Sequence, residues 1–394
     1  MSRFCTVTIG YNRVDSLLRL LQAVENADYG EDECTLIVSL DNCGNYDVYN
    51  MANAFQWSHG EKRVVLQEKR LGLKNHILKC GDYLKEFEAG AILEDDIVVS
   101  SAYYQYMKQA VAYYRDDQNI AGISLYTHLR NPMAKYAFEP AKTIYDTYFI
   151  QYAQSWGQIW INDHWEAFKR WLQNNDTSFR SAPCVPQNVS EWSDRSWLKY
   201  HIRYCIEENK YFVYSYDAYS TCFSEAGEHC WLKQNVHQVP MLYDARKKYR
   251  FAPFNDKYGA VFYDAYFERQ HLRISEVDSK EGVTIDLYGN KKITDYDARF
   301  VLSSSILDYK VVKSYGREMR PQEMNILCGI EGEDYFLYDT NENVHNHRKK
   351  NEVNEYIYFN KVLGHTGVIV RVLVEKFREK VYLLWRGVKN SLIK

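Results

Sequence analysis

The chain has 394 residues, of which 46% are hydrophobic and 26% charged, so it is long and apolar enough to bury a full α/β core. Its 49 Lys and Arg against 52 Asp and Glu give a net charge of −3, which excludes a global field that would draw the protein to nucleic acid. The nine Cys contain no C-x-x-C pair, so the sequence implies no zinc site, and their odd number favours reduced thiols.

Short β-rich runs alternate with helical patterns over the first 130 residues, which is typical of βαβ units that feed a mainly parallel sheet. Strands are predicted over 4–10, 35–40, 63–67, 91–94 and 121–125. Helices are predicted over 15–27, 48–58, 74–88 and 102–115. In the first helix, Asp15 is expected to be the N-cap, and Leu17, Leu18, Leu21 and Val24 form an apolar stripe at helical spacing. We therefore expect an α/β fold with a mixed, mainly parallel sheet flanked by helices.

Residues 145–235 are aromatic and irregular, and tryptophans are concentrated there. These are Trp156, Trp160, Trp165, Trp171, Trp192, Trp197 and Trp231. Aromatic rings suit the apolar faces of sugars, although they are equally common in protein cores. Beyond residue 240 the pattern is weaker, and only one strand, over 283–287, is predicted.

The last segment, 367–394, is a predicted basic amphipathic helix. Its apolar residues recur at spacings of 4, 3, 4, 3 and 4, at Val370, Val374, Phe377, Val381, Leu384 and Val388. Seven Lys and Arg against two Glu leave it with a charge of +5. Such a helix can lie on an anionic lipid surface, or it can dock on its own domain as an ordinary terminal helix.

Polar groups follow four of the predicted strands. They are Asn12 and Arg13, Asp41 and Asn42, the run from Arg70 to Lys74, and Glu94, Asp95 and Asp96. Each group, taken alone, could simply stabilise a turn. In an open α/β sheet, however, ligands bind beyond the carboxyl ends of the strands, so these groups are expected to share one site.

The three consecutive carboxylates Glu94, Asp95 and Asp96 are the most informative feature. Adjacent acids repel each other, and a fold rarely places them after a buried strand without a counter-ion. A hard cation such as Mn²⁺ or Mg²⁺, bridging a diphosphate, would supply that charge; the alternative is a solvated acidic loop.

Transfer of a sugar from a nucleoside diphosphate needs charge neutralised on the leaving diphosphate, and an inverting reaction also needs a base for the acceptor hydroxyl. The metal with Arg70 or Lys74 could neutralise the diphosphate. Asp194 is the predicted base, with Glu191 in reserve, because both lie in the aromatic half. The alternative role of Asp194 is a helix N-cap before Trp197.

Four runs in this order resemble the nucleotide-sugar half of glycosyltransferases with the GT-A fold, a Rossmann-like architecture. They are TVTIGYNR (6–13), IVSLD (37–41), GLK (72–74) and LEDD (93–96), and the Glu-Asp-Asp form resembles the N-acetylglucosaminyltransferase I type. Downstream, SWG (155–157), DRSW (194–197) and FSEAGEH (223–229) look like bacterial polysaccharide-biosynthesis relatives of that type. The resemblance covers residues 4 to 235.

This resemblance implies that Asp41 contacts the base or ribose and that Asn12 and Arg13 line the same pocket. Asp96 would be the main metal ligand, with Glu94 and Asp95 towards the ribose and sugar. It also implies a turn around His229 near the diphosphate and metal. Trp156, Trp160 and Trp197 are the expected acceptor-binding residues. The chain departs from the relatives at 156–160 and 225–229, where WGQIW and EAGEH replace their usual motifs.

We therefore expect four parts: a nucleotide-sugar half (1–130), an acceptor and catalytic half (131–240), an extension (241–366) and the basic helix (367–394). The predicted activity is metal-dependent, inverting transfer of a hexosyl or N-acetylhexosaminyl group, with a UDP-sugar favoured, to a saccharide or lipid-linked acceptor in surface polysaccharide synthesis. The alternatives are a sugar nucleotidyltransferase, whose Gly-rich loop is missing after the first strand, and an inactive carbohydrate-binding scaffold.

The expected location is the cytoplasm or the inner face of the cytoplasmic membrane. The N-terminus enters a strand-like run without signal-peptide features. No window reaches the roughly 18 to 20 apolar residues that span a bilayer.

Overall fold

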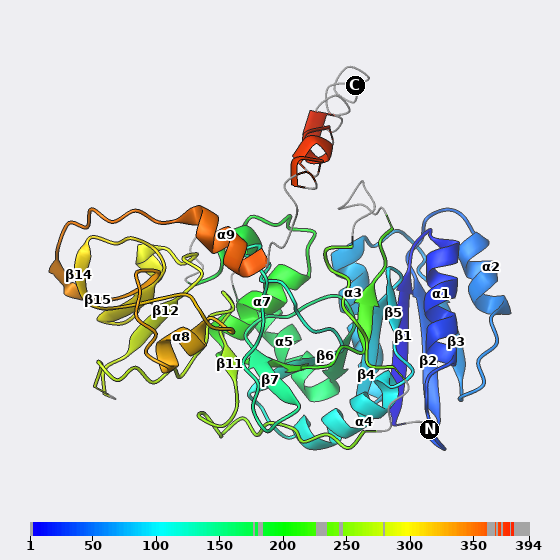
Figure 1. Cartoon of the computed structure of the whole chain (residues 1–394). Helices are drawn as coiled ribbons and strands as arrows, with labels where there is room; N and C mark the ends of the chain where they lie inside the picture. The colour runs from blue at the N-terminus through cyan, green and yellow to red at the C-terminus, as the bar shows by residue number, and fades with distance from the viewer. Residues whose placement is uncertain are drawn as a thin grey trace. The chain divides into compact units, whose positions relative to one another are not determined.

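The structure is a computed structural model that describes residues 3–175, 178–179, 184–225, 235–243, 247–278, 280–360 and 367–381, the last without 368, 372 and 379 (Figure 1). The chain divides into two compact units, residues 1–350 and 351–394. The larger unit holds the sheets and the cavity discussed below.

The first part of the larger unit alternates strands and helices, as the sequence predicts. The elements are β1 (Phe4–Gly10), α1 (Val14–Glu25), β2 (Cys34–Leu40), α2 (Asp47–Ala54), β3 (Lys62–Leu66), α3 (Leu73–Asp82), the 3₁₀ turn η1 (Tyr83–Glu86), β4 (Ala89–Glu94), β5 (Ile97–Val99), α4 (Tyr103–Tyr114) and β6 (Ile120–Ser124). The predicted strand ends differ by at most two residues.

The aromatic part adds shorter elements. These are β7 (Thr147–Ile150), β8 (Gln158–Ile161), α5 (Asn162–Asn174), α6 (Gln187–Ser190), α7 (Leu198–Glu207), β9 (Tyr211–Ser215), β10 (Ser220–Cys222) and β11 (Phe262–Tyr263). Together with the earlier strands they form a nine-stranded sheet of order β11-β7-β9-β6-β8-β4-β1-β2-β3. Its β4-β1-β2-β3 part is wholly parallel, whereas β8 pairs antiparallel with both β4 and β6. The expected mixed, mainly parallel sheet is confirmed.

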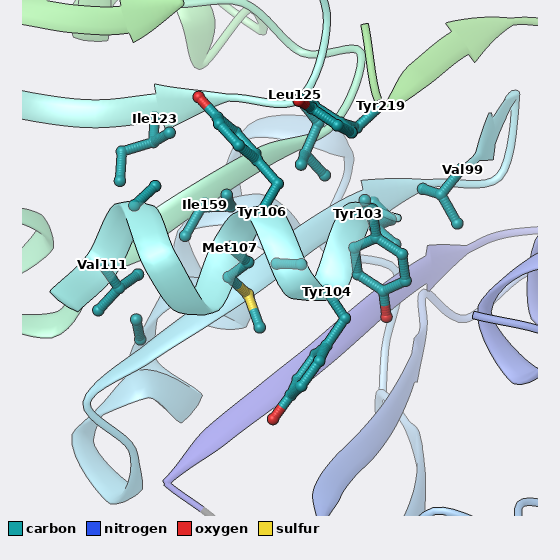
Figure 2. Packing of buried hydrophobic residues seen from close by; sticks show 14 of the residues in the cluster. Val99, Tyr103, Tyr104, Tyr106, Met107, Val111, Ile123, Leu125, Ile159 and Tyr219 are labelled. Atoms are coloured by element: carbon teal, nitrogen blue, oxygen red, sulfur yellow. The ribbon is translucent and has the colours of Figure 1, made fainter. Parts of the chain in front are cut away.

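Helices cover both faces of this sheet. One core cluster joins α1, α2 and α4 to alternate residues of β2 and β4, such as Leu36 and Leu93. Figure 2 shows the centre of that cluster, where Tyr103, Tyr104 and Tyr106 of α4 spread across the neighbouring strands. On the other face α3 packs against α5, because Gly81 leaves room for the indole ring of Trp165.

Two details of α1 differ from the sequence prediction. The residue at the N-cap position is Arg13, and Asp15 lies inside the first turn, where its negative charge still favours the helix dipole. The buried stripe contains Leu17, Leu20, Leu21 and Val24, whereas Leu18 is only partly buried. Leucines at adjacent positions point about 100° apart on a helix, so Leu18 and Leu17 do not share a face.

The extension after residue 240 contains a second sheet, of which the sequence predicted only one strand. Its elements are β12 (Val283–Asp286), the 3₁₀ turn η2 (Ile293–Asp295), β13 (Phe300–Ser303), β14 (Tyr309–Tyr315), α8 (Glu323–Leu327) and β15 (Tyr335–Asn343), with strand order β12-β13-β15-β14. It lies at the β11 end of the large sheet (Figure 1).

The smaller unit begins with α9 (Glu352–Asn360). The described residues between 367 and 381 are also helical, within the segment where the basic helix is predicted. Of the helices that the structure describes, none has the length and apolar character needed to cross a bilayer.

Candidate functional site

A cavity of about 480 Å³ opens at the carboxyl ends of β1, β2 and β4, where the strand-end rule predicts a ligand. Six of the predicted nucleotide-sugar residues line it, namely Asn12, Arg13, Asp41, Arg70, Glu94 and Asp95, together with the predicted metal ligand Asp96 and the predicted acceptor residue Trp156. The fold thus brings together side chains that are more than 140 positions apart in the sequence.

At one end of the cavity, Asp41 organises the loop that leads into α3. Its carboxylate accepts hydrogen bonds from the backbone N–H groups of Leu71 (2.7 Å), Gly72 (2.9 Å) and Asn42 (2.9 Å). Gly72 has a φ of +75°, a conformation that strongly favours glycine. Asp41 therefore holds the backbone of this loop in place and also lines the cavity.

Arg70 and Tyr11 form a stacked pair at the same end. The guanidinium carbon lies 5.0 Å from the centre of the Tyr11 ring, and both residues line the cavity. Lys74, in contrast, is not among the lining residues, and its ammonium lies 3.6 Å from the centre of the Tyr200 ring.

The acidic segment lines the cavity between the end of β4 and the start of β5. The Asp96 carbonyl accepts a 2.8 Å hydrogen bond from the Phe223 N–H, which extends the β5–β10 pairing and holds the turn in place. Asp95 is buried and forms an ion pair with Arg13. The local fold of the acids therefore depends on both β10 and the start of α1.

Burial and mutual repulsion perturb these acids. Burial, followed by the charges of Asp96 and Asp95, raises the pKa of Glu94 well above its usual range. Burial also raises the pKa of Asp95 to about 6, although Arg13 opposes that shift. Glu94 and Asp96 thus add negative charge beside the Asp95–Arg13 ion pair, and a divalent cation there would favour the ionised form of these acids.

The donor atoms suit a hard divalent cation. Carboxylate oxygens are the ligands that Mn²⁺ and Mg²⁺ prefer, and Glu94 and Asp96 both present them to the cavity. Within the described part of the chain, no three His, Cys, Asp or Glu side chains already converge in metal-binding geometry. A bound cation would therefore take further ligands from outside this set, such as phosphate oxygens or water.

Another part of the cavity lining comes from β10, the segment around residue 237 and Trp156. The rings of Trp156 and His237 stack with centroids 4.7 Å apart. Glu225 binds Arg19 (2.7 Å) and the Ser16 hydroxyl (2.7 Å), and these hydrogen bonds lower its pKa to about 2. Through these bonds, the cavity-lining Glu225 connects the segment after β10 to α1.

Comparisons with known proteins give partial structural matches. Neither a family model nor a curated protein matches the sequence. Among solved structures, residues 1–349 of TarS from S. aureus, in complex with UDP-GlcNAc, match with 15% identity and a TM-score of 0.38, over 58% of this chain and 60% of that fragment. The mannosyltransferase PcManGT from Pyrobaculum calidifontis, in complex with GDP-Man and Mn²⁺, matches with 16% identity and a TM-score of 0.30, over 43% of this chain and 46% of that chain. The matches cover less than two thirds of either protein.

The predicted base, Asp194, lies outside the group of cavity-lining residues. Its side chain is 92% exposed and accepts a 2.6 Å hydrogen bond from the buried Lys199 ammonium. This bond, with the charges of Lys199 and Lys74, lowers the pKa of Asp194. Glu191 is also exposed and accepts a 2.6 Å hydrogen bond from Gln187.

Two of the three predicted acceptor residues are core side chains. Trp160 is 0% exposed and stacks on Trp165, with ring centroids 3.9 Å apart, and Trp197 is 2% exposed. A covered indole ring cannot touch an acceptor, so of these three tryptophans only Trp156 is placed to do so. Alternation along β8 explains Trp160, because Ile159 and Ile161 occupy the other face. His229 lies outside the described residues.

Several cavity residues were not predicted from the sequence. They are Tyr11, His76, Cys222, Phe223, Glu225, His237 and Gln238. Tyr11 directly precedes the predicted Asn12, and His76 lies one helical turn after Gly72, so the strand-end rule could have included both. His237 and Gln238 give no such signal, because only the pairing of their segment with β10 brings them to the cavity, as in the 2.9 Å bond from the Val239 N–H to the Thr221 hydroxyl.

Proposed function

We propose that the chain is a nucleotide-sugar-dependent glycosyltransferase. The observation that carries this proposal is the cavity at the strand ends, where Glu94, Asp95 and Asp96 lie together with Arg13 and a stacked Arg–Tyr pair lines the same cavity. A nucleoside diphosphate with a divalent cation would match that arrangement in charge.

Within this proposal, the donor nucleotide lies at the Asp41 and Arg70 end and the diphosphate lies near the acids. Asp96, with Glu94, would hold Mn²⁺ or Mg²⁺, and the cation would neutralise charge on the leaving diphosphate. Arg13 fixes Asp95 through their ion pair, so Asp95 keeps its place during turnover. Trp156 offers an aromatic face to the acceptor sugar.

An inverting reaction needs a base, and Asp194 remains our candidate, with Glu191 in reserve. Asp194 lies within electrostatic range of Lys74, whose neighbour Leu73 lines the cavity. The acceptor would have to reach from Trp156 to this rim. The proposed acceptor is a saccharide or lipid-linked saccharide of a surface polysaccharide, and a UDP-sugar is the favoured donor.

The test is turnover with a panel of nucleotide sugars and Mn²⁺ by the wild type and by Asp96→Asn. Loss of several kcal/mol of charge stabilisation should lower the rate of nucleotide release by at least about a hundredfold. Asp116→Asn is the matched control, because that side chain is 93% exposed and far from the acids in the sequence. Failure of the wild type to bind or turn over any of the donors would end the proposal.

A catalytically inactive carbohydrate-binding scaffold is the alternative. It requires Asp96→Ala and Asp194→Ala to leave ligand binding and surface polysaccharide unchanged in cells. Loss of the polysaccharide in both variants, with folding intact, would exclude it. A sugar nucleotidyltransferase would instead produce pyrophosphate from a nucleoside triphosphate and a sugar phosphate, which the same assays distinguish.

We also propose that the basic helix binds the inner face of the membrane. Val370, Val374, Phe377 and Val381 lie at helical spacing and are each at least 44% exposed, while the neighbouring Arg371, Lys376 and Arg378 supply positive charge. Deletion of 367–394 should abolish sedimentation with anionic vesicles and leave activity on a soluble acceptor unchanged. Equal sedimentation of both proteins would show that the helix has a structural role.

A further inference from the structure

The segment that follows β6 packs beside Trp156, the residue proposed to face the acceptor. The ring of Tyr126 lies 4.8 Å from that of Trp156, and the ring of His128 lies 6.1 Å from it. The Tyr126 hydroxyl also donates a 3.0 Å hydrogen bond to the carbonyl of His237, whose own ring stacks on Trp156. Alternate residues of this segment therefore pack around the Trp156–His237 stack.

Arg130 continues this alternation and brings a positive charge to the same edge of the cavity. It follows His128 by two residues, so the two Cα atoms lie within about 7 Å of each other, and a long side chain can reach His237 from there. Its charge does act on His237, because burial, and next the Arg130 guanidinium, lowers the pKa of that ring. Among the described residues, no carboxylate contributes to this shift. The Trp156 edge is thus positive, in contrast to the acidic segment.

The backbone at Arg130 is held in place by the turn that follows it. Arg130 pairs with Ala137 in an antiparallel bridge. The next residue, Asn131, is 0% exposed; its NH₂ group donates to the Tyr266 carbonyl (3.1 Å), and its side-chain oxygen accepts from the Met133 N–H (2.8 Å). A ligand that binds Arg130 therefore does not have to order this part of the chain.

The Arg130 guanidinium lacks a counter-ion. It is partly buried, yet it forms no hydrogen bond and no ion pair with any residue that the structure describes. Arg13, by comparison, is bound to Asp95. A guanidinium presents its N–H groups as a planar fork that binds a carboxylate or a phosphate through two hydrogen bonds. The complement of Arg130 is therefore an anionic group on a ligand.

We propose that the acceptor is an acidic saccharide, and that Arg130 binds its anionic group while a neighbouring sugar ring contacts Trp156. This inference rests on the proposed function and names the class of acceptor. The donor diphosphate is not the expected partner, because it is assigned to the cavity beside the acids, and Arg130 is not among the lining residues. Gln238, which is exposed and lines the cavity, offers its amide to a sugar hydroxyl.

The test is binding of the full chain, with and without UDP and Mn²⁺, to immobilised saccharides in matched sets. Each set holds a neutral oligosaccharide and three acidic forms of it, which carry a uronic acid, a phosphate ester or a lipid diphosphate. The wild type should bind an acidic form at least about tenfold more tightly than the neutral one, because hydrogen bonds between charged groups are the strong ones. The form that binds identifies the source of the anion, and added NaCl should weaken its binding more than that of the neutral form.

Two variants assign this preference to Arg130. Arg130→Gln removes the charge and should reduce the preference for the acidic form by about tenfold, whereas Arg130→Lys keeps a charge without the planar fork and should retain part of it. The guanidinium has no bonds to the fold, so the Tm of both variants should equal that of the wild type. Arg170→Gln is the matched control, because Arg170 is an exposed arginine of α5.

The outcomes separate this inference from the proposed function. Equal binding of neutral and acidic forms by the wild type, binding of no acidic form, or an equal preference in the wild type and Arg130→Gln would each overturn the role of Arg130. Turnover of a nucleotide sugar by the same wild-type preparation would leave the proposed function standing in all three cases. Absence of turnover with every donor would instead refute the proposed function.

Discussion

At the scale of single residues, the ion pair between Arg13 and Asp95 stabilises the acidic part of the cavity. Arg13 is about two-thirds covered, with 33% of its side chain exposed, and it is bound to the buried Asp95. Removal of one partner leaves the other buried and unpaired, and this costs more than the net gain from the pair. The guanidinium therefore substitutes for part of the charge that a metal would bring.

We predict that Arg13→Ala lowers the free energy of unfolding by about 1–3 kcal/mol, because the buried Asp95 loses its ion-pair partner. Mn²⁺ should then raise the Tm of Arg13→Ala more than that of the wild type, since the ion supplies the missing charge. Thermal melts with and without Mn²⁺ measure both effects. Arg115→Ala, at a 47% exposed position, should show neither. An equal response to Mn²⁺ in all three proteins would contradict the electrostatic interpretation of the acids.

At the scale of elements, the contact of α3 with α5 places the loop that enters the nucleotide end of the cavity. A Cβ atom at Gly81 would lie 2.1 Å from the Trp165 indole. Alanine is better than glycine in a helix by about 1 kcal/mol, whereas overpacking costs about 1–3 kcal/mol or more. The indole is covered on its other face by Trp160, so it cannot move aside, and the clash should dominate.

Gly81→Ala should therefore destabilise the protein by about 1–2 kcal/mol in urea unfolding, despite its better helix propensity. It should also weaken nucleotide binding, because a shifted α3 moves Gly72 and His76. Gly282→Ala is the matched control, since its nearest neighbour would lie at 3.4 Å and should be tolerated. A stabilised Gly81→Ala protein would show that the two helices can separate at no cost.

The sequence predicted these elements well where one local signal was sufficient. The strands β1, β2 and β4 are largely apolar, buried runs bounded by turns, and their carboxyl ends carry polar residues that the cavity brings together. Weaker sequence signals supported the predicted roles of Asp194, Trp160 and Trp197. An acid or an indole among aromatic residues has the same sequence pattern whether it lies in the core, on the surface or in a site. Only the pairing of β8 and the packing of α7 distinguish these positions.

At the scale of the whole molecule, the pairing of strands that are far apart in the chain could not be predicted from the sequence. The insertion of β8 between β4 and β6, and the return of residues 237–239 beside β10, depend on contacts between distant segments. Most strands of the second sheet contain few apolar residues in alternation. Tyr309–Tyr315, for example, has lysines at 310 and 313, and its register is irregular. The position of β14 in the sheet therefore depends on its pairing with β15, a contact between distant segments that its own sequence does not specify.

The junction of the two sheets is built from buried charged groups. Asp264 follows β11 and binds Lys291 (2.6 Å), while Glu268 is 0% exposed and accepts a 2.7 Å hydrogen bond from the Tyr288 N–H. Burial, and next the charge of Asp286, raises the pKa of Glu268 well above 4.5, although Lys291 opposes the shift. The folded protein therefore keeps a proton on Glu268 that the unfolded chain releases.

This linkage fixes the sign of a pH effect. Because the folded pKa of Glu268 is raised, its contribution to stability is complete below the unfolded pKa and is lost as the pH rises through the folded pKa. Glutamine has no proton to lose and can still accept from Tyr288. Glu268→Gln should thus lose less free energy of unfolding than the wild type as the pH rises above about 5, which lies just above the ordinary pKa of glutamate. Urea unfolding across that range measures the difference, and Glu333→Gln, at a 75% exposed position, should follow the wild type. Parallel pH profiles for all three proteins would mean that Glu268 is ionised in the fold and fully compensated by Lys291.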